Sequence, residues 1–417
     1  MGDGPLDDIP QGGWKAAHGW AMPEPVEPIL VVLILLLAMY FTRRREYAVL
    51  GPKARYEPVV DEESPRSSNE LDVAAEHRAN PHPPKARSLL WMRFETPNSS
   101  RFARHIHSRI LQKFPFLVEM FYWGISFAVY RATKDLAAAY YGGQKSMWDN
   151  ARVHGITILE AEALLWGGGR DAPQRWLEWR IQRWFLHGSE AGDARAWLLT
   201  ILNRGYALVH VPGTVFFVAY FYATTKSHPR FCTIRRTLTW TNLLAMCCFV
   251  ILPTMPPRLL PKRYDFVDTV SLEDAESVWM AGDFVNKLAA FPSMHFGWSF
   301  CVGCVFVADS GVLDGVFSWL DDYEDGGALR KTTQSRTESA VKFLVGTAYP
   351  AFVLTAIIAT ANHYFLDAFA AILVAAMALA SNRVLLVFLP LEDWLLWALR
   401  LEKPVPTTGR KRSLVIA

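Results

Sequence analysis

Two long apolar runs near the C-terminal end constrain the fold of this chain most. They cover residues 342–361 and 364–389, and only Asn362 and His363 separate them. A helix needs about 20 consecutive apolar residues to cross the hydrocarbon core of a bilayer, and both runs reach this length. Further apolar runs cover residues 29–41, 115–132, 197–223, 237–255 and 290–308. The pattern predicts an all-α polytopic membrane protein with six to seven transmembrane helices, depending on whether the short first run spans.

The composition fits this class. Of the 417 residues, 51% are hydrophobic and 20% are charged, and the mean hydropathy is +0.11 although long stretches are polar. The apolar residues must therefore be concentrated in blocks. A net charge of +3 is too small to indicate a nucleic-acid partner. The five cysteines form neither a disulfide framework nor a complete zinc signature, so we expect them to be small packing residues.

Five segments are expected along the chain. Residues 1–28 form a short polar N-terminal segment, and residues 29–42 form the first transmembrane helix, which three arginines follow at once. Residues 43–113 are rich in Pro, Ser, Glu and Arg and are expected to be a disordered cytoplasmic linker. Residues 114–390 are expected to be a membrane-embedded catalytic helical domain, and residues 391–417 a basic cytoplasmic tail.

The distribution of basic residues predicts which ends of the helices face the cytoplasm. The linker, the tail and the basic segment 224–236 are assigned to the cytoplasmic side. With an odd number of helices, the N-terminus then lies outside, and so do three polar clusters next to the apolar runs. These clusters contain Arg258, then Ser293 with His295, then His363 with Asp367.

The segment before the third apolar run has helical spacing of a different kind. Between residues 175 and 185, aromatic and aliphatic residues alternate with arginines, as in an amphipathic helix. Such a helix either lies on the membrane surface or packs on the helical bundle like any other. The sequence leaves both alternatives open.

His363 and Asp367 are the first candidates for chemistry. Four residues apart on a helix, they share a face and can form a hydrogen bond. A carboxylate on one imidazole nitrogen leaves the other nitrogen free to attack or to accept a proton. An Asp within an apolar run is costly without a partner, so the residue is a functional candidate. The alternative is a structural pair, in which His363 and Asp367 only satisfy each other's hydrogen-bonding groups.

Ser293, His295 and Arg258 complete the candidate set. Ser293 and His295 lie at the start of the run 290–308, where unpaired backbone N–H groups and the helix dipole favour an anion. Arg258 is a fixed cation suited to phosphate, with Lys262 and Arg263 as auxiliary candidates. The alternative for His295 is a structural histidine in the core, and the alternative for Arg258 is an arginine at the membrane interface. A metal site would need more carboxylates or thiolates, so no metal is expected.

In this order, Arg258, Pro292-Ser293-x-His295 and His363-x-x-x-Asp367 resemble the signature segments of the phosphatidic acid phosphatase type 2 superfamily. More narrowly, Pro-Pro-Arg-Leu-Leu-Pro, Phe-Pro-Ser-Met-His and Asn-His-Tyr-Phe-Leu-Asp are similar to segments of the inositol phosphorylceramide synthase branch, the fungal inositolphosphotransferase domain. The resemblance covers about residues 110–390 and implies a phosphatase-type helical core.

The resemblance also implies roles. His363 would be the nucleophile that forms a phosphohistidine, Asp367 would orient it, and His295 would be the general acid. Ser293 and Arg258 would bind the phosphate, with no metal or organic cofactor. Two cations of the wider superfamily are missing, because Ile251 and Ile357 occupy their positions. The synthase branch also lacks the second of these cations.

Three functions are compatible with these residues. The first is phosphoinositol transfer from phosphatidylinositol to a ceramide-type acceptor, which belongs to sphingolipid metabolism. The second is hydrolysis of a lipid phosphate, such as phosphatidic acid or a sphingoid-base phosphate. The third is a non-catalytic membrane scaffold. The resemblance implies lipid partners and a place in the endomembrane system, in the Golgi or the ER, with the active site facing the lumen or exterior. The sequence gives no oligomeric state.

Overall fold

The computed structural model describes residues 26–50, 82–89, 92–165, 176–186, 194–225, 227–270, 286–313 and 335–408. The expected N-terminal segment up to residue 25 and the arginines and lysine at 410–412 lie outside these residues. The described part is mostly helical, in agreement with the predicted class.

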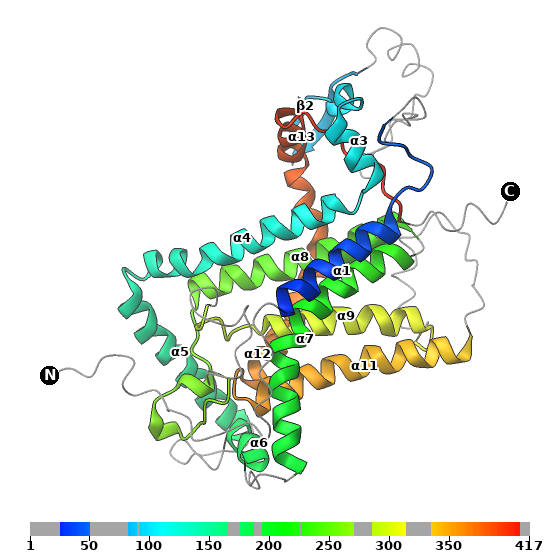
Figure 1. Cartoon of the computed structure of the whole chain (residues 1–417). Coiled ribbons are helices and arrows are strands. Elements are labelled where there is room, and N and C mark those ends of the chain that lie inside the picture. The colour runs from blue at the N-terminus through cyan, green and yellow to red at the C-terminus, as the bar shows by residue number, and fades with distance from the viewer. Residues whose placement is uncertain are drawn as a thin grey trace.

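The main body is a bundle of long helices (Figure 1). Helix α9 lies beside α11, α4 lies beside α8, α12 packs on α8 and α9, and the short α1 packs on α7. Their bounds are α1 (Val26–Thr42), α4 (Leu117–Tyr140), α7 (Ala194–Thr224), α8 (His228–Ile251), α9 (Met294–Ser310), α11 (Arg336–Ala359) and α12 (Phe365–Ser381). Helices α5 (Gln144–Leu165) and α6 (Leu177–Leu186) lie at one end of this bundle.

Fewer helices qualify as membrane spans than the sequence predicts. Within the described ranges, Arg336–Ala359 and Phe365–Ala398 are long and apolar enough to cross a membrane, with mean hydropathies of 1.8 and 2.2. A third span results if the two halves of α7, which meet at 57°, count as one. The expected six to seven spans are therefore not confirmed, because α4 and α8 carry several charged residues and α9 has only 17 residues.

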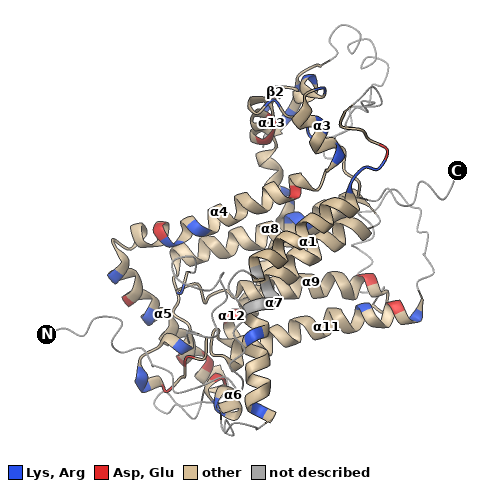
Figure 2. Ribbon diagram, viewed as in Figure 1, with Lys and Arg blue, Asp and Glu red and all other residues tan. Residues whose placement is uncertain are grey.

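Figure 2 shows that charged residues are unevenly distributed between the helices. The middle of α11 has no charged residue, and its charges gather near its N-terminal end. Charged residues are frequent on α5 and α6. Helix α6 packs on α7 and α11, which matches the second of the two alternatives for this segment, a helix packed on the bundle.

Two glycines allow α9 and α11 to approach closely. A Cβ atom on Gly303 would lie 2.5 Å from the carbonyl oxygen of Gly346, and one on Gly346 would lie 2.8 Å from that of Gly303. Both distances are shorter than real contacts, so only glycine fits here. Small residues at such contacts let two helix backbones meet, as is common in membrane bundles.

Part of the expected disordered linker 43–113 is ordered instead. Strands β1 (Lys85–Leu89) and β2 (Met92–Thr96) form an antiparallel hairpin, followed by the 3-10 helix η1 (Ser99–Phe102) and helix α3 (Ile106–Lys113). These elements lie against α13 (Leu389–Ala398), which follows α12 through the 3-10 helix η6 (Asn382–Phe388) (Figure 1).

A buried carboxylate explains this order. Asp393 of α13 accepts hydrogen bonds from Arg87 Nε (2.7 Å), Arg87 Nη2 (3.1 Å) and Thr96 Oγ1 (2.8 Å). Residues 400–408 add backbone bonds, since the Glu402 N–H donates to Ser108 Oγ (3.0 Å). The prediction of disorder is wrong for the described residues 82–89 and 92–113, because distant residues of the chain supply the partners that this segment lacks by itself.

Candidate active site

A short buried turn carries His363. Helix α11 ends at Ala359 and α12 begins at Phe365, so His363 precedes α12 rather than lying within it. The N–H groups of Asn362 and His363 both donate to the Ile357 carbonyl, at 2.9 and 3.2 Å. Ala361 has a φ of 52°, in the left-handed region, and is fully buried. The surrounding packing thus holds this turn in one conformation.

The hydrogen bonds of His363 define which ring nitrogen carries the lone pair. Its Nδ1 lies 2.8 Å from the Ala290 carbonyl oxygen and 3.2 Å from Asp367 Oδ2. Both neighbours are acceptors, so Nδ1 carries the proton and Nε2 carries the lone pair. Asp367 is fully buried and also accepts from the Tyr364 N–H at 2.9 Å. The predicted His363–Asp367 contact is therefore present, with Asp367 in the first turn of α12.

Ser293 and His295 lie at the start of α9, as the sequence predicts. Ser293 is the N-cap residue, because its Oγ accepts from the Phe296 N–H at 3.3 Å. Its own N–H donates to the Asp367 carbonyl at 3.1 Å, which joins the start of α9 to α12. A hydroxyl that caps through its oxygen retains an O–H donor. The imidazole of His295 lies 5.7 Å from that of His363, centroid to centroid.

Arg258 is fixed beside the same turn. Its Nε donates to Asn362 Oδ1 and its Nη1 to Asp268 Oδ2, both at 2.8 Å. The backbone N–H of Arg258 donates to the Ala361 carbonyl at 2.9 Å. The side chain is 7% exposed and its charge is matched by Asp268. No sequence pattern indicated Asp268, which lies ten residues after Arg258.

A cavity of about 250 Å³ joins three of the predicted site residues, whereas Ser293 and Asp367 are not among the residues that line it. Arg258, His295 and His363 line it together with aromatic side chains of α4 and α7. Its lining includes residues from Glu119 to Tyr130 of α4, which at 1.5 Å per residue is a length of about 16 Å. A space with polar groups at the histidines and aromatic walls suits an amphipathic ligand.

The auxiliary cations differ from those expected. Lys262 and Arg263 are exposed and are not among the residues that line the cavity. Lys287, which the sequence argument missed, is exposed and lines it. Ile357 is fully buried in the core, and Ile251 is exposed, so neither position supplies a cation.

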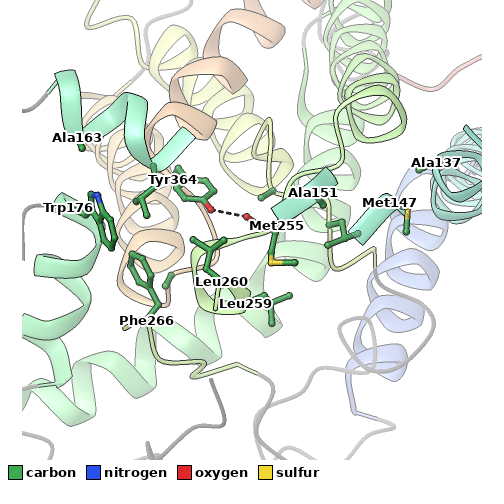
Figure 3. Packing of buried hydrophobic residues seen from close by; sticks show 14 residues of the cluster. Ala137, Met147, Ala151, Ala163, Trp176, Met255, Leu259, Leu260, Phe266 and Tyr364 are labelled. Carbon is green, nitrogen blue, oxygen red and sulfur yellow. Dashed lines mark hydrogen bonds between the residues drawn. The ribbon is translucent and has the colours of Figure 1, made fainter. Parts of the chain in front are cut away.

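An aromatic cluster supports the site from behind. Tyr364 is fully buried, and its hydroxyl donates to the Met255 carbonyl at 2.8 Å (Figure 3). Leu260, Phe266 and Trp176 pack in the same cluster. The cluster therefore fixes the segment that carries Arg258 against the turn that carries His363.

Two buried carboxyl groups hold the first turn of α12, and the sequence argument missed both. The Leu366 N–H donates to Glu162 Oε1 at 2.5 Å, and the Phe365 N–H donates to Glu178 Oε1 at 3.3 Å. Burial, together with a hydrogen bond to Glu178 and the charge of that residue, raises the pKa of Glu162 to about 11. The sequence signal that could have indicated Glu162 is its position in an apolar stretch of α5.

Among the described residues, no group of three or more His, Cys, Asp or Glu side chains is arranged to hold a metal ion.

Comparisons with curated proteins and with solved structures gave no match. A family model described as the PAP2 superfamily matches residues 174–319 and 330–381, which include all five predicted site residues and exclude α4 and α5. This match supports the assignment of the chain to the PAP2 superfamily.

Proposed function

We propose that this protein is a membrane-embedded lipid phosphotransferase in which His363 forms a phosphohistidine intermediate. The observation that carries the proposal is the anchoring of His363 Nδ1 by Ala290 and Asp367, in a histidine that lines a cavity shared with Arg258 and His295. Nε2 then has the lone pair that a nucleophile needs. Superfamily membership supports a phosphatase or phosphotransferase type of activity.

In the first step, Nε2 of His363 attacks the phosphorus of the donor lipid. A P–N bond forms, the bond from phosphorus to the leaving oxygen breaks, and that oxygen takes a proton from the His295 imidazolium. Asp367 stabilises the positive charge that develops on the His363 ring. Arg258 and the Ser293 hydroxyl bind the non-bridging phosphate oxygens, because charged and O–H donors are strongest where negative charge develops.

In the second step, the acceptor hydroxyl gives its proton to neutral His295. The acceptor oxygen attacks phosphorus, the P–N bond breaks, and its electron pair returns to Nε2. With a lipid alcohol as acceptor the net reaction is transfer, and with water it is hydrolysis. Fixed cations and donors carry the phosphate charge, so we propose that the reaction needs no metal.

For the substrates, we propose phosphatidylinositol as donor and a ceramide-type lipid as acceptor. The segments around Arg258, His295 and His363 support this choice by their similarity to the inositol phosphorylceramide synthase branch. The aromatic cavity along α4 gives room for an apolar chain beside the histidines. We further propose a multi-pass protein of the Golgi or ER, with the site at the luminal or exterior face and the C-terminus in the cytoplasm.

The test is a transfer assay with purified protein in detergent. Phosphatidylinositol with ceramide is one arm, and phosphatidic acid alone is the other. We expect a phosphoinositol-ceramide product, lost in His363→Ala and kept in His154→Ala. His154 is a matched control, because it also bonds a backbone carbonyl, at Pro253 (2.8 Å), but does not line the cavity. Free phosphate without a transfer product would indicate the phosphatase, and neither product would indicate the scaffold.

A further inference from the structure

The first turn of α12 is bound from the side by two acids of two different helices. Glu162 of α5 and Glu178 of α6 are 1% and 0% exposed. They accept hydrogen bonds from the consecutive N–H groups of Leu366 and Phe365. The next residue is Asp367, whose Oδ2 bonds Nδ1 of His363. The two glutamates thus hold the backbone that places the partner of the proposed nucleophile.

The remaining oxygens of this pair lack an ordinary donor. Oε2 of Glu162 and Oε2 of Glu178 are both buried without a hydrogen-bond donor from the described part of the protein. The two carboxyl groups are close enough for the charge of Glu178 to raise the pKa of Glu162. Two adjacent buried carboxylates repel each other and cannot both ionise easily. One proton between them removes the repulsion and satisfies both oxygens.

We propose that Glu162 and Glu178 are a positioning pair that shares one proton, holds the first turn of α12, and so sets the place of Asp367 against His363. This inference rests on the proposed function, since it concerns how His363 is oriented for catalysis. Neither glutamate lines the cavity, so both act through the backbone of α12 and not on the substrate. Glu162 also lies outside the residues that the family model matches.

The pair makes activity sensitive to high pH. Three acids among the described residues face Glu162, namely Glu178 of α6, Asp367 of α12 and Tyr364 just before α12. All three of these groups are acids, and none of them can supply a positive charge. Loss of the shared proton therefore leaves two uncompensated negative charges on Glu162 and Glu178. The two glutamates then repel, and the turn that carries Asp367 shifts. Misplacement of a catalytic group by about 1 Å can lower the rate by about 10²-fold.

The sign of the stability effect follows from proton binding. In the unfolded chain a Glu has a pKa of about 4.3. The folded protein retains the proton on Glu162 to higher pH. At pH values between the unfolded and the folded pKa, the folded protein therefore binds more protons than the unfolded chain. Stability from this group therefore falls as the pH rises above the unfolded pKa, until the folded pKa is passed.

The experiment compares Glu162→Gln, Glu162→Ala and the control Glu160→Gln in the purified full chain. Gln keeps an acceptor for the Leu366 N–H and a donor for Glu178, and it carries no titrating proton. Glu160 lies on the same helix two residues earlier and is only partly buried. We expect kcat of the wild type to fall at alkaline pH, and we expect Glu162→Gln to keep kcat near neutral pH and to lose this alkaline fall.

Glu162→Ala is expected to lower kcat by about tenfold or more with little change in KM. The unfolding temperature of the wild type and of Glu160→Gln should fall between about pH 6 and pH 9, and that of Glu162→Gln should fall less. The same kcat profile and the same unfolding profile in Glu162→Gln and the wild type would overturn the inference. If the wild type transfers no phosphoryl group, the proposed function fails, and the unfolding profiles decide the shared proton independently.

Discussion

The contact between Arg258 and Asp268 gives the sharpest stability prediction. The two side chains are 7% and 8% exposed, and Nη1 of Arg258 lies 2.8 Å from Oδ2 of Asp268. The other oxygen of Asp268 accepts from the Val270 N–H at 2.9 Å. Asp268→Ala removes both acceptors and takes the carboxylate of this ion pair away from the buried guanidinium, which keeps its hydrogen bond to Asn362.

The expected magnitude follows from this geometry. Removal of one partner from a buried ion pair costs about 3–5 kcal/mol, because the other charge stays buried without compensation. Asp268→Asn keeps one acceptor oxygen for two donors, so we expect it to cost about 1–3 kcal/mol. The control is Asp265→Asn. The Asp265 carboxylate lies 2.5 Å from Arg183 Nη2, but it is 53% exposed, so its ion pair contributes about 0.2–1 kcal/mol.

The assay is denaturant unfolding of the three variants and the wild type in the same detergent. We expect the order Asp268→Ala, then Asp268→Asn, then Asp265→Asn, from most to least destabilised. Equal stability of Asp268→Ala and Asp265→Asn would refute the reasoning, because Arg258 would then not depend on its buried partner.

Three further predictions concern catalysis and packing. His295→Ala should lower kcat by about 10²–10⁴-fold in the transfer assay, and full activity would exclude its role as general acid. Lys287→Gln should raise KM about fivefold with kcat unchanged, since an exposed cation at the cavity contributes about 1 kcal/mol to anion binding. Gly303→Ala should destabilise the protein by about 1–3 kcal/mol, because the new Cβ meets the Gly346 carbonyl. Gly124→Ala, where a Cβ meets nothing within 4 Å, should instead stabilise the protein by about 0.5–1 kcal/mol in the same unfolding assay, because Ala is more favourable than Gly inside a helix.

Local patterns predicted the parts of the site that depend on near neighbours. The spacing of His363 and Asp367 indicated their contact, and the structure has it at 3.2 Å. Ser293 and His295 were expected at a helix start, and α9 begins at Met294. The convergence of Arg258 with these residues followed from the assignment of sides and from the resemblance, and Arg258, His295 and His363 do line one cavity.

Local sequence patterns could not predict the contacts between residues that are far apart in the chain. Glu162 bonds the N–H of a residue 204 positions later, and no local signal connects the two. The hairpin at residues 85–96 looks too polar to fold, and Asp393, about 300 positions later, supplies its partner. The expected six to seven spans were not confirmed, since an apolar run of sufficient length can also belong to a helix that is buried among its neighbours.

The central claim is that phosphorus becomes covalently bound to His363. The direct measurement is a quench of the protein during turnover with a donor lipid labelled at phosphorus, followed by detection of label on the denatured chain. Phosphorus bound to an imidazole nitrogen is expected to survive base and to be lost in acid. The account predicts acid-labile label on the wild type and on His154→Ala, and none on His363→Ala. Label of equal amount on His363→Ala, or turnover of the wild type without any bound label, would contradict it.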